Sequence, residues 1–109
     1  VVLLVIVAVA IAPRDTAASV GRVDFDAVRK VVHARCTSCH AASPKHPAFQ
    51  AAPAGVVLET DVQIVAEALR IHHQTVVTRV MPIGNLTDIT EEERDVIDRW
   101  YRAGAGAGE

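Results

Sequence analysis

The strongest constraint on the fold is the pentapeptide Cys36-Thr37-Ser38-Cys39-His40, which holds the only two cysteines of this 109-residue chain. The pattern C-x-x-C-H is the attachment signature of a c-type haem. Two cysteines three residues apart on one helical turn lie on the same side, where each can bond to a vinyl group of one porphyrin. His40 is then placed under the iron as its proximal ligand. The motif predicts a small fold built around one covalent haem.

Two other interpretations of the cysteine pair stay open. A dithiol redox motif needs a thioredoxin-like βαβ context, and the sequence shows no convincing strand alternation. A structural zinc site needs two further ligands in a paired H-x(3–5)-H or second C-x-x-C pattern. The other histidines are not spaced in that way; they are His33, His46, His72 and His73.

Composition divides the chain into four parts. Residues 1–13 are apolar and are interpreted as the end of a transmembrane helix, although a cropped signal peptide is the alternative. Residues 14–23 are small and polar and are interpreted as a linker. Residues 24–103 form the predicted cytochrome domain, and residues 104–109 alternate alanine and glycine like a flexible tail. A domain of about 80 residues usually needs a staple, which a covalent haem would supply.

Eleven basic and thirteen acidic residues are mixed along the chain, and the formal net charge is −2. No basic stripe is present. This charge pattern argues against a nucleic-acid partner.

Three helical segments are predicted, and nothing argues for a sheet, so the predicted class is all-α. The first begins at Asp24 as N-cap, and its apolar face leads into the cysteine motif. That face consists of Phe25, Val28 and Val32, with Val31 as a further candidate. The second opens with a capping box at Thr60 and Gln63 and ends before Pro82. Its predicted buried side consists of Val62, Val65, Ala66, Leu69, Val76, Val77 and Val80. The third opens with a capping box at residues 90–93, and its predicted buried residues are Val96, Ile97, Trp100 and Tyr101.

The second axial ligand of the iron is predicted to be Met81, the only methionine in the chain. It stands before Pro82, which biases it away from helical geometry, about 40 residues after the proximal histidine. Met/His ligation raises the reduction potential and leaves no open site on the iron. His72 and His73 are the rival distal ligands, although His73 continues an apolar stripe and is expected to be a buried core residue.

The proximal imidazole needs a hydrogen-bond acceptor for its other ring nitrogen. A backbone carbonyl from residues 53–55 is expected to supply it, with residues 49–51 as the alternative. Val56, Val57 and Leu58 are then expected to pack on the proximal face of the porphyrin.

The motif C-T-S-C-H, the proline-rich loop after it, and M-P before a helix ending in Trp-Tyr resemble a class I cytochrome c. The resemblance covers about residues 24–103 and implies three to five helices around haem, with the first and last crossing. The chain departs from this family at one position: many members have an aromatic residue four positions before the first cysteine. Here that position is Val32, and Phe25 lies two turns earlier on the same face.

Three stretches, CTSCHAASPKHPAF, APAGVVLET and RVMPIGNLTDITEEERDVIDRWYRAG, are similar to the C-terminal cytochrome domain of bacterial membrane-bound urate oxidases. By this resemblance Cys36 and Cys39 attach haem c, His40 is proximal and Met81 is distal. A membrane-embedded oxidase domain of the same parent chain would convert urate to 5-hydroxyisourate. The cytochrome would pass the electrons to a soluble cytochrome or terminal oxidase from the periplasmic side of the inner membrane. The alternatives are an independent membrane-anchored or secreted cytochrome and a haem sensor with an open sixth site.

Overall fold

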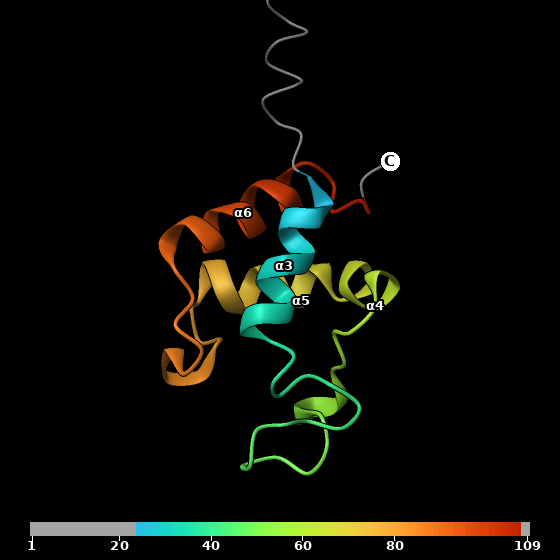
Figure 1. Ribbon diagram of the computed structural model, residues 1–109. Coiled ribbons are helices and arrows are strands. Elements are labelled where there is room, and N and C mark those ends of the chain that lie inside the picture. Colours follow the sequence, from blue (N-terminus) through green and yellow to red (C-terminus); the bar gives the residue numbers. More distant parts are fainter. Residues whose placement is uncertain (1–23, 108–109) are drawn as a thin grey trace, which may run out of the picture.

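The computed structural model describes residues 24–107, and every regular element in this range is a helix (Figure 1). The α-helices are α3 (Phe25–Arg35), α4 (Asp61–Ala66), α5 (Ala68–His72) and α6 (Glu91–Arg102). Short 3-10 helices η1 (Pro53–Gly55) and η3 (Ile83–Asn85) and the π-helix η2 (His73–Val77) complete the set. The all-α prediction is therefore confirmed for residues 24–107. Within that range no helix combines the length and hydrophobicity needed to cross a membrane. The apolar segment and linker predicted for residues 1–23 lie outside the described residues.

Helices α3 and α6 pack against each other, as Figure 1 shows. Asp24 caps α3 as predicted, because its side chain accepts a hydrogen bond of 3.0 Å from the backbone N–H of Asp26. The helix buries Phe25, Val28, Val31 and Val32. The rings of Phe25 and Trp100 meet with their centroids 6.0 Å apart, a distance typical of aromatic pairs. Phe25 therefore supplies the aromatic contact between the first and last described helices.

Both ends of α6 are capped. The Thr90 hydroxyl accepts from the Glu93 N–H at 3.1 Å, and the Glu93 carboxylate accepts from the Thr90 N–H at 2.9 Å. At the other end Gly104 has φ +107°, and the Ala105 N–H donates to the Trp100 carbonyl, which is a Schellman motif. The Trp100 indole N–H also donates to the Gly106 carbonyl at 2.8 Å, so the residues after the helix fold back onto the core.

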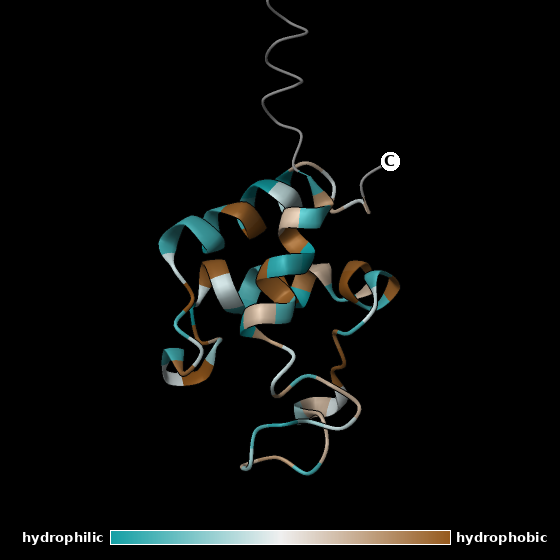
Figure 2. Cartoon of the chain, in the orientation of Figure 1, coloured by the Kyte–Doolittle hydropathy of each residue, from teal (hydrophilic) through white to brown (hydrophobic). Residues whose placement is uncertain are grey.

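The apolar face predicted for residues 60–80 is wrong for five of its seven residues, and only Val65 and Val76 pack, partly buried, against the core. The capping box at Thr60 forms, but the buried residues of this segment are Ile64, Ala68, Ile71 and Thr75. The most exposed large hydrophobic residues of this segment belong to the predicted face: Val62 is 80% exposed and Leu69 is 67% exposed. Figure 2 shows hydrophobic colour on the outward side of α4 accordingly. The segment carries apolar residues on more than one side, and the side with Ile64 and Ile71 is the one buried in the core with Trp100.

A histidine joins α5 to α6, but it is His72 rather than the expected core residue His73, which is exposed. The His72 Nε2 lies 2.8 Å from the Asp98 carboxylate, and its ring stacks on Tyr101 with a centroid distance of 4.1 Å. Asp98 also accepts a hydrogen bond of 2.9 Å from Arg102. The contact ties the middle of the chain to the last described helix.

The Asp98 contact predicts a pH dependence of stability. The hydrogen bond from His72, followed by that from Arg102, lowers the pKa of Asp98 below its ordinary value. A carboxylate with a lowered folded pKa contributes stability above its unfolded pKa of about 4, and this is lost as pH falls through the folded pKa. We expect Asp98→Asn to lower the unfolding free energy at neutral pH and to flatten its decline in acid. Urea unfolding measured from neutral pH to about pH 3 checks this. Asp95→Asn, an exposed site on α6, is the control, and a wild-type acid slope in Asp98→Asn would contradict the assignment.

Candidate functional site

An apolar cavity of about 250 Å³ lies between the loop that follows α3 and the loop that precedes α6. Figure 1 shows both loops extending from the same end of the helical layer. All four residues predicted from the sequence line it: Cys36, Cys39, His40 and Met81. The remaining lining residues are Arg35, His46, Ala48, Phe49, Pro53, Pro82, Ile83, Leu86 and Thr87.

The cysteine motif continues α3 as helical turns. The N–H of Cys36 donates to the Val32 carbonyl at 2.8 Å, and the N–H of His40 donates to the Cys36 carbonyl at 2.9 Å. These bonds have the i to i+4 spacing of an α-helix. Both thiols are free and half-buried. The turn therefore brings both sulfurs and the imidazole to one wall of the cavity, as the motif predicts.

Burial raises the pKa of the Cys36 thiol to about 12, with the nearby Cys39 and Glu93 adding to the effect. A dithiol redox motif works through a cysteine whose pKa is lowered, so that the thiolate forms near neutral pH. The surroundings of Cys36 have the opposite effect. They argue against the redox interpretation of the motif.

His40 is oriented by hydrogen bonds to the segment after η1. Its Nδ1 lies 3.0 Å from the Val56 carbonyl, and its own carbonyl accepts from the Leu58 N–H at 2.9 Å. A carbonyl only accepts, so Nδ1 carries the proton and Nε2 keeps a lone pair for a metal. The acceptor was expected among the carbonyls of residues 53–55, but it is the carbonyl of the next residue, Val56. The reason is that η1 ends before the chain passes His40. Leu58 is buried, whereas Val56 and Val57 are half-buried.

Met81 comes to the cavity from the other loop, and both of its backbone polar groups are bonded. Its N–H donates to the Gln74 carbonyl at 2.9 Å, and its carbonyl accepts from Arg94 Nη1 at 3.1 Å. Further along the loop, the Asn85 side chain accepts from the Ile89 N–H at 2.8 Å. The loop therefore has a defined path although it contains only the short η3.

Arg35 is a cavity residue that the sequence reasoning missed. Its Nη1 donates to the Thr87 carbonyl at 2.5 Å, the Thr87 hydroxyl donates back to the Arg35 carbonyl, and its Nε binds Glu93 at 3.0 Å. These bonds fasten the end of α3 to the Met81 loop and to α6. No motif includes this arginine, and its place just before Cys36 is the only signal that could have found it.

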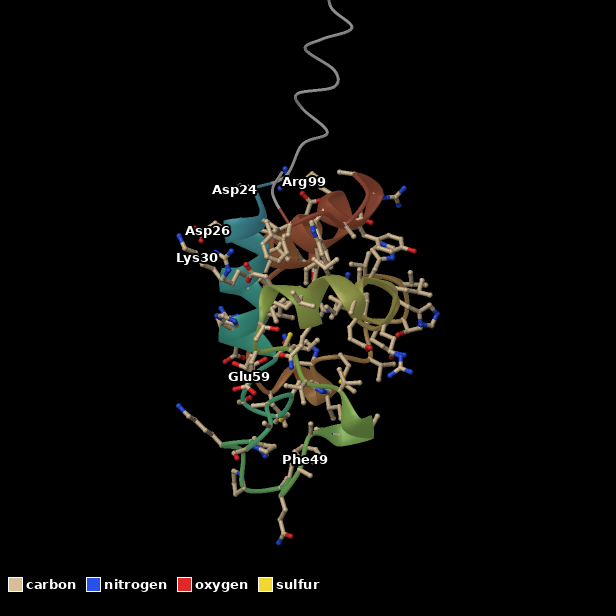
Figure 3. The ribbon with its side chains drawn as sticks, turned by 90° about the vertical axis from the view of Figure 1, so that its right-hand side faces the viewer. Asp24, Asp26, Lys30, Phe49, Glu59 and Arg99 are labelled. Carbon is tan, nitrogen blue, oxygen red and sulfur yellow. The ribbon has the colours of Figure 1, made fainter. Side chains whose placement is uncertain are left out.

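The other histidines divide into one that lines the cavity and three that do not. His46 lines it, and its Nδ1 accepts from the Ala48 N–H at 3.1 Å. Phe49 lies beside it in the loop beyond the helices (Figure 3), with the two ring centroids 5.9 Å apart. The rival distal ligands His72 and His73 are not among the cavity residues, and neither is His33.

The side chains around the cavity fit a c-type haem. They supply two free thiols for thioether bonds, an imidazole nitrogen and a thioether sulfur as iron ligands, and an apolar wall for the porphyrin. Within residues 24–107, no three His, Cys, Asp or Glu side chains gather as a metal site of the zinc type would require.

No protein-family model, curated protein or solved structure matches this chain.

Proposed function

We propose that this chain is a one-electron carrier that holds one haem c through Cys36 and Cys39, with His40 and Met81 as axial ligands of the iron. The observation that carries the proposal is that these four residues, chosen from the sequence alone, line one apolar cavity. When bound, the haem supplies an iron that alternates between its ferric and ferrous states.

The protein's contribution is attachment, orientation and the exclusion of water. Cys36 and Cys39 would hold the haem through thioethers, each thiol adding across a vinyl group so that sulfur bonds to one carbon and the thiol hydrogen goes to the other. His40 presents Nε2 because the Val56 carbonyl fixes its Nδ1 proton. Met81 supplies a thioether sulfur, a ligand that raises the reduction potential. With both axial positions filled by protein, this arrangement favours an electron carrier over a haem sensor or haem enzyme.

A redox titration of the haem-loaded chain, followed by its absorbance, tests this function. We expect a reversible one-electron curve with a slope of about 59 mV per decade. We also expect complete reduction by an equimolar reduced cytochrome of lower potential. A chain with no reversible redox change in the absorbance would overturn the proposal.

The electron donor that we propose is a membrane-embedded domain of the same parent protein that oxidises urate to 5-hydroxyisourate. The acceptor is a soluble cytochrome or a terminal oxidase, with this domain on the periplasmic side of a bacterial inner membrane. The support for this finer assignment is the resemblance of three sequence stretches to urate oxidase cytochrome domains.

Urate added anaerobically to the full-length parent protein tests the finer assignment. Reduction of the haem is the expected result, and a parent carrying Cys36→Ser and Cys39→Ser is the control without attached haem. If the titration of the domain succeeds and urate leaves the parent's haem oxidised, the urate assignment is wrong and the electron carrier stands.

A further inference from the structure

Arg94 is a buried arginine on α6 that does not line the cavity. It is only 7% exposed, and its Nη1 donates to the Thr75 carbonyl at 2.5 Å and to the Met81 carbonyl at 3.1 Å. Its Nε has no hydrogen-bond partner, and the nearest carboxylate, that of Glu91, is 3.8 Å away. Burying a charged group is costly unless it is well bonded. Burying the Arg94 charge therefore costs free energy, and the hydrogen bonds that offset this cost go mainly to two backbone carbonyls. One of these carbonyls belongs to Met81.

The two bonds of the Met81 backbone determine where its side chain begins. Its N–H is bonded to Gln74 in η2, and its carbonyl is joined to α6 only through Arg94. Val80 before Met81 is 54% exposed, Pro82 after it is half-buried, and Ile83 beyond that is 51% exposed. The other contact between this stretch and α6 is the ion pair of Arg79 and Glu91, whose side chains are 48% and 71% exposed. Exposed ion pairs contribute little stability.

We infer that Arg94 is the positioning residue for Met81: its guanidinium fixes the Met81 carbonyl so that the thioether sulfur stays at the cavity. The inference rests on the proposed function, in which that sulfur binds the iron. Without the guanidinium, the Met81 backbone keeps only its bond to Gln74. The sulfur then leaves the iron more often, and an added ligand competes for the vacated position more easily.

Imidazole binding to the ferric, haem-loaded protein measures this effect, with the far-red absorbance of the iron–sulfur bond as readout. Arg94→Met keeps an unbranched apolar stem and removes the guanidinium donors. We expect half-displacement of Met81 at about tenfold lower imidazole concentration, the effect of one lost bond to a charged donor. Arg94→Lys keeps one charged donor, so its half-displacement is expected at an imidazole concentration between those of the wild type and Arg94→Met. Arg99→Met, on the exposed side of α6 (Figure 3), is expected to titrate like the wild type.

If Arg94 acted only through the overall stability of the protein, a destabilising substitution elsewhere in the core would shift the imidazole titration in the same way. Val28→Ala removes buried volume from α3 and neither of the Met81 backbone hydrogen bonds, so it is expected to lower stability while leaving the imidazole titration unchanged. If Arg94→Met does not fold, Arg94→Lys carries the test through its intermediate shift. Wild-type imidazole binding in the folded Arg94 variants would overturn the inference.

Met81→Ala separates this inference from the proposed function. It is expected to lose the far-red band and to bind imidazole most tightly of all. If it keeps the band and the wild-type titration, the ligand assignment fails and the role of Arg94 fails with it. If Met81→Ala changes both and the Arg94 variants change neither, only the role of Arg94 is wrong.

Discussion

Replacing Cys36 and Cys39 together with serine is expected to abolish covalent haem attachment. Both free thiols border the cavity, and the chain contains no other cysteine. Serine keeps the size of each side chain but does not form a thioether with a vinyl group. Both proteins are expressed with haem-maturation machinery and run on a denaturing detergent gel. The wild-type band is expected to keep its haem absorbance, and the band of the double variant is expected to show none.

Ser38→Ala is the matched control, because Ser38 lies between the two cysteines and is not a predicted attachment site. It is expected to keep covalent haem. Each single cysteine variant is expected to keep one thioether and to show a reduced yield. Haem that stays on the denatured double variant would place the attachment elsewhere and contradict the assignment.

Trp100→Ala is expected to lower the unfolding free energy by about 3–5 kcal/mol. Trp100 is 2% exposed, its ring meets Phe25 across the contact of α3 with α6, and its indole N–H bonds the Gly106 carbonyl. Small domains have a total stability of about 5–15 kcal/mol, so this loss removes a large part of it. Urea unfolding followed by circular dichroism measures the change, since the substitution removes the only tryptophan.

Trp100→Phe is expected to recover most of the loss, because it restores the aromatic contact but not the bond to Gly106. The neighbouring Arg99→Ala controls for changes to the helix itself, since that side chain is half exposed. A Trp100→Ala protein as stable as Arg99→Ala would show that the contact between α3 and α6 is not the centre of the core.

The ends of the helices were predictable because their signals are local. Asp24, Thr60 and Thr90 each accept a bond from a backbone N–H two or three residues later, and these bonds need only the neighbouring sequence. The apolar face of α3 was also correct, because its valines and Phe25 lie on one side only. A helix with one apolar side can pack against the core in only one orientation.

The orientation of residues 60–80 was not predictable from period alone. Valines and leucines outnumber the residues that are actually buried, and a constant period of 3.6 residues was assumed throughout. The helix breaks at Glu67, where φ is −101° and ψ is 16°, and turns into a π-helix from His73. Each change rotates the later residues relative to the earlier ones. As a result His72, and not His73 as expected, lies against α6.

The ligand residues of the site were predictable, but the residues that hold them in place were not. Cys36, Cys39 and His40 form a contiguous motif, and Met81 is the only methionine of the chain. Arg94 bonds Met81 from thirteen residues away, and arginine is normally assigned to the surface. Its spacing of three residues from the buried Ile97 is the signal that could have placed it on the inner face of α6.

The optical spectrum of the purified, haem-loaded chain, oxidised and then reduced with dithionite, tests the central claim most directly. The account predicts sharp c-type bands in the reduced protein and a weak far-red band in the oxidised protein, from the bond between iron and the Met81 sulfur. C-type bands without the far-red band would remove Met81 from the ligand set. A colourless protein made with competent maturation machinery would contradict the account as a whole.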